Sequence, residues 1–161
     1  MATLLQLMVD NWSTALDEYE QEYLAENPWK LTKQRPIDWL DDNFPRFMRS
    51  LDEIFDTSAP YALNSGPNES GIYFLIYEDE IAETLAYVGL SICIPMRLNQ
   101  HYKNKPFTHF NYICGIPTMF LAAVESYYIH RFQPPLNAKI EHLHEIAAKH
   151  LSMIGEVCDA A

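Results

Sequence analysis

The chain has 161 residues and a mass of 18.7 kDa, and 48% of it is hydrophobic and 13% aromatic, which is enough to bury the core of one domain. Its formal charge of -11 argues against general nucleic-acid binding, because affinity for a phosphate backbone comes mainly from Lys and Arg. No apolar stretch approaches the roughly 20 residues that span a bilayer, and no signal peptide is recognisable, so we expect a cytoplasmic protein without a membrane partner.

The first 60 residues have the pattern of helices. Apolar side chains recur at helical intervals over 3–26, and a second helix is predicted over about 38–55, with Pro45 as an interruption. Residues 1–70 contain 13 acids and five bases. The acids are most simply a solvated helix face, and the alternative is a surface for a homodimer or a protein partner. We therefore expect an acidic, helical N-terminal extension over 1–60, with no catalytic residues.

A cluster of turn-forming residues follows, and we place a linker at 61–70. Beyond it the pattern changes from helical to β-rich, and 71–77 (GIYFLIY) and 84–88 (TLAYV) are predicted strands of a hairpin. The remaining predicted elements are a helix over 94–103, a third strand over about 109–114, and helices over 118–132 and about 138–157.

The residues with useful chemistry lie in the second half of the chain. Residues 87–140 contain five Lys or Arg and one acid, which predicts a local basic face on an acidic protein. Two phenols, two cationic donors, one carboxylate and one amide are available there: Tyr73, Tyr87, Arg97, His101, Glu125 and Asn137. Such a set is sufficient for a metal-assisted cut of a phosphodiester.

Each of these residues also has an ordinary structural interpretation. A tyrosine on a strand usually packs in the core or across strands. Arg97 and His101, at i and i+4, share a helix face and could be an exposed pair, and Asn137 follows two prolines, where turns and helix caps are common. Glu125 shares a helix face with apolar residues, where an unpaired carboxylate is costly to bury. Its partner is therefore expected to be either an Arg or Lys or a divalent cation.

The order of these residues resembles the GIY-YIG nuclease superfamily. The resemblance covers about 70–140 and consists of GIY at 71–73, YVG at 87–89, an Arg and a His four residues apart, a helical Glu and PPLN at 134–137. It implies an α/β (α+β) fold over 71–157, in which a three-stranded antiparallel sheet is flanked by helices and the two motif tyrosines lie on the first two strands.

The resemblance also implies a role for each of these residues. Tyr73 is expected to take a proton from the attacking water, and Tyr87 to orient the water and the phosphate. Arg97 is expected to stabilise the charge that develops on the phosphate. His101 is expected to contact the phosphate or to relay a proton.

Cofactor and substrate follow from the same resemblance. Glu125 is expected to hold one Mg²⁺ (or Mn²⁺), with most of the other ligands supplied by water and phosphate. Asn137 is expected to hydrogen-bond within the site. Contacts with a DNA substrate are assigned to Arg97. Apart from the resemblance, Lys103, Lys105 and His109 are weaker candidates, which either touch the DNA backbone or are ordinary surface residues.

The expected activity is thus a metal-dependent endonuclease that hydrolyses phosphodiester bonds in DNA. Against it, the connection between GIY and YVG is acidic, and no separate DNA-reading module is evident. Three alternatives remain open: a nuclease of low affinity delivered by a partner, a GIY-YIG-like protein that binds nucleic acid without cutting it, or a decoy or inhibitor whose acidic half engages a DNA-binding protein.

Overall fold

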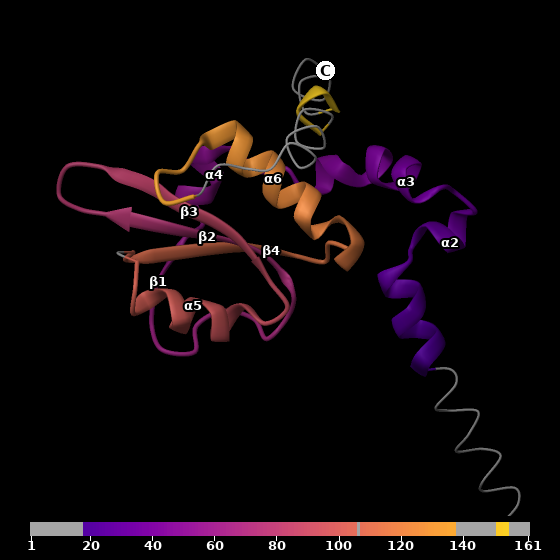
Figure 1. Cartoon of the computed structure of the whole chain (residues 1–161), viewed down its shortest axis with the longest axis horizontal. Coiled ribbons are helices and arrows are strands. Elements are labelled where there is room, and N and C mark those ends of the chain that lie inside the picture. The colour runs from indigo at the N-terminus through magenta and orange to yellow at the C-terminus, as the bar shows by residue number, and fades with distance from the viewer. Residues whose placement is uncertain (1–17, 106, 138–150, 155–161) are drawn as a thin grey trace, which may run out of the picture. The chain divides into compact units, whose positions relative to one another are not determined.

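The computed structural model describes residues 18–105, 107–137 and 151–154 (Figure 1). The contacts divide the chain into two compact units, with the division between Leu40 and Asp41. The segment 61–70, expected as a linker, lies inside the second unit. None of the described helices is long and apolar enough to cross a membrane.

The first unit is helical in its described part, as predicted. Residues 18–26 form a helix, and α2 (Trp29–Thr32) and α3 (Pro36–Asn43) follow it. The rings of Trp29 and Trp39 meet edge to face with their centroids 6.2 Å apart. The earlier part of the helix predicted over 3–26 lies outside the described residues.

The region predicted as a helix over 38–55 with an interruption at Pro45 is three separate elements, and the first break falls at the predicted proline. After α3 comes the 3-10 helix η1 (Phe44–Phe47), with Pro45 in its first turn, and then α4 (Leu51–Asp56). Pro45 cannot donate an intrahelical hydrogen bond. Ser50 starts α4 anew, because its hydroxyl accepts a backbone N–H bond at 3.1 Å and caps the helix.

The sheet has four antiparallel strands, in the order β1-β4-β2-β3 (Figure 1). They are β1 (Ala59–Pro60), β2 (Gly71–Glu78), β3 (Glu83–Ser91) and β4 (His109–Cys114). The three predicted strands are confirmed, but the expectation of a three-stranded sheet was wrong by one strand. Because β1 has only two residues and one is a proline at the sheet edge, it carries no strand pattern in the sequence.

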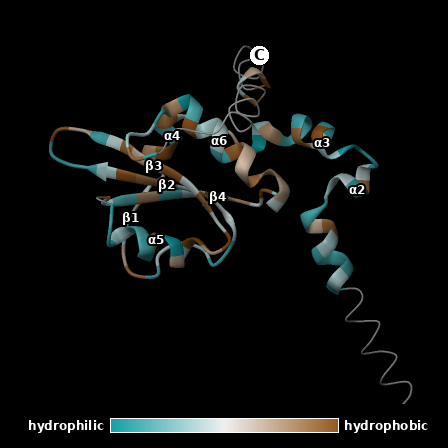
Figure 2. Ribbon diagram, in the orientation of Figure 1, coloured by the Kyte–Doolittle hydropathy of each residue, from teal (hydrophilic) through white to brown (hydrophobic). Residues whose placement is uncertain are grey.

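Two helices cover opposite faces of this sheet (Figure 1). They are α5 (Ile94–Tyr102) and α6 (Leu121–Phe132), the latter preceded by a 3-10 turn, η2 (Thr118–Phe120). The hydroxyl of Tyr73 contacts His101 of α5, whereas the ring of Phe74 meets Tyr128 of α6 at 5.0 Å. Neighbouring side chains on a strand point to opposite faces. The first six residues of β2 are consequently all buried, and Figure 2 shows hydrophobic residues along this strand.

The phenol of Tyr128 links α6 to the segment between η1 and α4. Its hydroxyl donates to the carbonyl of Phe47 and accepts the N–H of Arg49 at 2.9 Å. Burial raises the pKa of Tyr128, and the nearby Tyr127 adds to the effect. Tyr128 is thus a neutral structural tyrosine that holds together parts of the chain far apart in sequence.

We expect Tyr128→Phe to lower the free energy of unfolding by about 1–3 kcal/mol, because it leaves one buried and one partly buried backbone group without their partner. Urea denaturation followed by circular dichroism measures this loss. Tyr112→Phe is the matched control, since Tyr112 is 42% exposed, and it should change stability by less than about 0.5 kcal/mol. Equal effects of the two substitutions would contradict the structural role of Tyr128.

Candidate active site

The glycine of the YVG tripeptide makes room for the two motif tyrosines. Tyr73 on β2 lies directly opposite Gly89 on β3. A Cβ atom at Gly89 would lie 2.3 Å from the Tyr73 hydroxyl and 2.8 Å from a ring carbon of Tyr87. The space of the missing side chain is therefore filled by the rings of the motif tyrosines, and any larger residue would displace them.

Tyr73 and His101 form a buried hydrogen-bonded pair. The Tyr73 hydroxyl lies 2.6 Å from Nε2 of His101, and the two side chains are 1% and 6% exposed. Burial raises the pKa of Tyr73 and Tyr87 adds to this, while the Arg97 guanidinium acts in the opposite direction without offsetting it. Burial, together with the charges of Lys105 and Arg97, lowers the pKa of His101 to about 4. At neutral pH the pair is a neutral phenol and a neutral imidazole.

Positive charge surrounds this pair. The ring of Tyr87 lies 6.1 Å from that of Tyr73 and 5.0 Å from that of His101, and Nζ of Lys105 lies 5.1 Å from the Tyr87 ring centroid. Arg97 is exposed, and its Nη1 donates to Gln100 at 2.9 Å. Arg97 and Lys105 offer donors that suit phosphate oxygens, while the tyrosines and the histidine lie beneath them.

Glu125 comes from the other side of the sheet. It is partly buried on α6, the helix that packs against the face opposite Tyr73. The helix α6 packs mainly against β3, which is an edge strand of the sheet. Glu125 therefore belongs to a helix on the opposite face of the sheet from the Tyr73–His101 pair.

The expected cation needs few protein ligands. Among the residues that the structure describes, no three His, Cys, Asp or Glu side chains form a group that could hold a metal. Mg²⁺ is compatible with such a donor set, because it usually keeps several waters and binds one or two carboxylates together with substrate phosphates. Glu125 is the carboxylate that would hold such an ion.

Asn137 pairs with the backbone of β3. Its Oδ1 accepts the N–H of Val88 at 2.9 Å, its Nδ2 donates to the Val88 carbonyl at 2.8 Å, and the N–H of Leu136 donates to Ala86 at 3.0 Å. Ala86 lies at an irregularity in the β2–β3 register, next to Tyr87. The Asn137 amide thus fixes the strand that carries Tyr87, while its backbone N–H donates to the carbonyl of Pro134 at 3.2 Å, as the turn interpretation expects.

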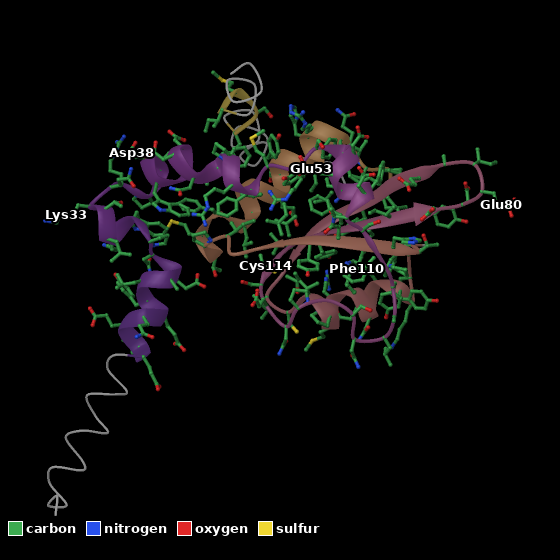
Figure 3. The ribbon with its side chains drawn as sticks, turned by 180° about the vertical axis from the view of Figure 1, so that it is seen from behind. Lys33, Asp38, Glu53, Glu80, Phe110 and Cys114 are labelled. Carbon is green, nitrogen blue, oxygen red and sulfur yellow. The ribbon has the colours of Figure 1, made fainter. Side chains whose placement is uncertain are left out.

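The other predicted DNA contacts are dispersed. His109 lies on β4, and its Nε2 is 3.2 Å from a carboxylate oxygen of Glu78 at the base of the acidic hairpin, whose far end carries Glu80 (Figure 3). Lys103 is exposed just beyond α5. Of the three lysine and histidine candidates, Lys105 is the one that contacts a motif residue.

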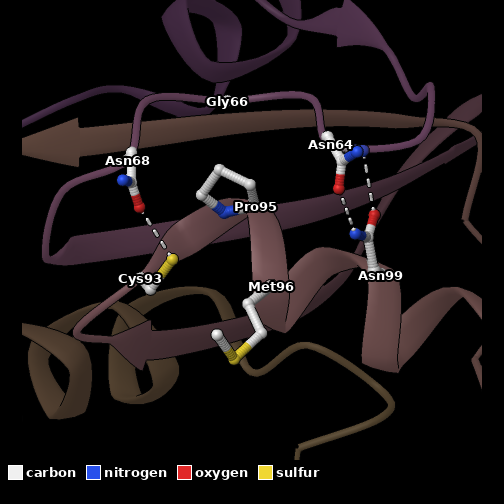
Figure 4. Close-up of a pocket in the computed structure, with 7 residues that line it drawn as sticks. All are labelled: Asn64, Gly66, Asn68, Cys93, Pro95, Met96 and Asn99. Atoms are coloured by element: carbon white, nitrogen blue, oxygen red, sulfur yellow. Dashed lines mark hydrogen bonds between the residues drawn. The ribbon is translucent and has the colours of Figure 1, made fainter.

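A pocket of about 450 Å³ beside the start of α5 had no signal in the sequence. It is lined by Asn64, Gly66, Asn68, Cys93, Pro95, Met96 and Asn99 (Figure 4). Asn99 organises it, because its Oδ1 accepts the Tyr61 hydroxyl at 2.6 Å and its Nδ2 donates to Asn64 at 2.9 Å. Tyr61 and Asn64 belong to the segment interpreted as a linker, and Tyr61 is 38 residues from Asn99, so no local pattern relates them.

Comparison with known proteins adds no assignment to this geometry. No protein-family model matches the chain, and no curated protein or solved structure matches it significantly. A functional conclusion therefore depends on the residues and their arrangement.

The depressed pKa of His101 predicts a loss of stability in mild acid. The unfolded chain binds a proton on this side chain near pH 6.5 and the folded chain only near pH 4, so the stability from neutral His101 is present above pH 6.5 and lost as the pH falls towards 4. We expect a loss of about 1–3 kcal/mol between pH 7 and pH 4.5. Urea unfolding at several pH values measures it.

The control for this prediction is a second histidine. His101→Gln should flatten the pH dependence, since glutamine keeps a hydrogen-bonding amide but does not titrate in this range. His109→Gln, at a partly exposed position on β4, should leave the wild-type pH dependence unchanged. A His101→Gln protein with the wild-type dependence would show that another group causes the acid sensitivity.

Proposed function

We propose that the chain is a GIY-YIG-type endonuclease that hydrolyses phosphodiester bonds in DNA and depends on a divalent metal. The observation that carries the proposal is a convergence of side chains from three elements, β2, β3 and α5, around one hydroxyl. Tyr87, Arg97 and His101 all act on the hydroxyl of Tyr73 through ring contact, charge or a hydrogen bond. Residues that match a motif only by chance have no reason to meet in this way.

The proton chemistry follows from the two shifted pKa values. Water attacks the phosphorus, the bond between phosphorus and the leaving oxygen breaks, and the proton of the water moves to the oxygen of Tyr73, while the leaving oxygen takes up a proton from solvent. Because burial disfavours a free phenolate, the original phenol proton moves at the same time to Nε2 of His101, which is 2.6 Å away and neutral. Arg97 lowers the cost of negative charge on Tyr73 while this happens.

The phosphate is held and neutralised from the solvent side. Arg97 is exposed and offers two parallel N–H donors to phosphate oxygens, and Lys105 adds a point charge beside Tyr87. Glu125 would hold one Mg²⁺ or Mn²⁺, which when bound stabilises charge on the phosphate and on the leaving oxygen. Asn137 keeps the backbone of β3, and with it Tyr87, in place.

A second function, binding of nucleic acid without cleavage, is favoured by the burial of Tyr73. With 1% of its surface exposed, Tyr73 meets a water molecule only if the site opens or the substrate admits one. The same basic groups, Arg97 and Lys105, would hold a phosphate backbone in either case.

Cleavage is tested on supercoiled plasmid with the full chain. We expect nicking in Mg²⁺, none in EDTA, and a loss of about 100-fold or more in rate for Tyr73→Phe, because the general base is removed. Glu125→Gln should not nick the plasmid, and added Mg²⁺ should not restore nicking. Tyr128→Phe is the matched control: it also removes a buried phenol with a raised pKa, and it should cut at the wild-type rate.

Two outcomes would change this proposal. If the Tyr73→Phe protein cuts plasmid at the wild-type rate, Tyr73 is not the general base. Retention of the plasmid in a gel shift, with no nicked form at high protein concentration, would favour binding without cleavage.

Arg97→Ala should reduce the rate far more than the affinity, because the guanidinium stabilises charge that develops during the reaction. We expect a loss of about 100- to 1000-fold in single-turnover rate and a change of a few-fold in Kd for DNA. Arg46→Ala, an exposed arginine on η1, is the control and should leave both unchanged. An Arg97→Ala protein that binds and cuts DNA normally would overturn the assignment.

A further inference from the structure

An exposed aromatic stack lies at the end of α5. The rings of Tyr61 and Tyr102 are stacked, with centroids 4.5 Å apart and planes inclined by 26°. The ring of Phe107 meets both of them edge to face, at 5.0 Å and 5.7 Å. Tyr102 nevertheless remains 57% exposed. The stack therefore presents a large part of an aromatic ring to solvent.

The support of this ring is fixed. The hydroxyl of Tyr61 donates to Oδ1 of Asn99 at 2.6 Å, and its backbone N–H donates to Thr108 at 3.0 Å. Phe107 is 5% exposed and belongs to the hydrophobic cluster beneath α5. Since Tyr102 rests on two immobilised rings, little side-chain entropy remains to be lost when a flat ligand covers it.

Two lysines follow Tyr102 in the chain, while Glu78 of β2 lies near the Tyr61 side of the stack, because its N–H donates to the Thr108 hydroxyl and the Thr108 carbonyl accepts the N–H of Tyr61. The lysines are Lys103 and Lys105, and the chain has no Asp or Glu between residues 84 and 124. Lys105 lies over the ring of Tyr87, which contacts His101. A ligand that combines a flat aromatic face with negative charge matches this surface better than an apolar or cationic one.

We infer that the Tyr61–Tyr102 stack holds an unpaired base of a nucleic-acid strand beside the Tyr73–His101 pair, so that the substrate class is single-stranded or locally unpaired DNA. A base inside an intact duplex has both faces covered by its neighbours and offers none to a protein ring. An unpaired base can stack on Tyr102 while Lys103 and Lys105 contact the adjoining phosphates. The position of the base relative to a cut rests on the proposed nuclease function. The binding of an unpaired base by the stack does not depend on that function.

The test uses an oligonucleotide with one 2-aminopurine, whose fluorescence falls when it stacks, as a single strand and as the matching duplex. All titrations of the full chain are made in EDTA to prevent cleavage. We expect the single strand to bind more tightly and its fluorescence to be quenched. Tyr102→Ala and Tyr102→Leu should weaken single-strand binding on the order of tenfold or more and abolish the quenching, because no ring remains.

Two variants serve as controls. Tyr102→Phe keeps the ring and should behave as the wild type. Tyr77→Ala removes a tyrosine that is 40% exposed on β2 and should also leave binding and quenching unchanged. Circular dichroism of Tyr102→Ala and Tyr102→Leu establishes that any loss does not come from unfolding.

The outcomes separate this inference from the nuclease proposal. Single-strand affinity and quenching that do not change in Tyr102→Ala would overturn the stacking site, even if plasmid is cut. Tighter binding of the duplex than of the single strand would also overturn it. If the quenching depends on Tyr102 but the protein nicks no plasmid, the stacking site is supported and only the nuclease proposal is contradicted.

Discussion

A hydroxyl buried within a sheet needs a hydrogen-bond partner, and the arrangement around α5 depends on this requirement. Burial without a partner would cost Tyr73 about 1–3 kcal/mol. Gly89 leaves the space in which the ring lies, and His101 supplies the partner. Ile94 and Leu98 bury the same helix against the same cluster, so apolar contacts and one polar contact fix α5 together. The exposed Arg97 of α5 then has a defined position beside the Tyr73 hydroxyl.

The burial that orders the pair also restrains its reactivity. A raised pKa keeps Tyr73 protonated, and a lowered one keeps His101 neutral, so neither group carries charge at neutral pH. Part of the shift at His101 comes from the charges of Lys105 and Arg97. A phosphate that neutralises these cations would remove that part and make the imidazole a better proton acceptor. In the proposed reaction, binding of an anion would thus prepare the pair for proton transfer.

Local patterns in the sequence predict most elements of the second unit and few of its contacts. The strand at 109–114 and the helices near 94–103 and 118–132 were predictable, because their side-chain periodicity reflects the faces they bury. The interruption at Pro45 was also predicted, but β1 and the new helix start at Ser50 were not, since a two-residue pairing and a helix cap carry no periodic pattern. At the site, the i, i+4 spacing predicted that Arg97 and His101 act together, whereas the pairing of Asn137 with β3 depends on a tertiary contact that spacing does not encode.

The amide of Asn137 has a consequence for the behaviour of the protein in concentrated solution. β3 is the last strand of the sheet, and an uncovered edge strand offers its N–H and C=O groups to strands of other molecules. Leu136 and Asn137 occupy these groups at Ala86 and Val88. They thereby protect the chain from edge-to-edge pairing and aggregation, next to the strand end that carries Tyr87. Protection of the sheet edge and the placement of a motif tyrosine thus depend on the same three hydrogen bonds.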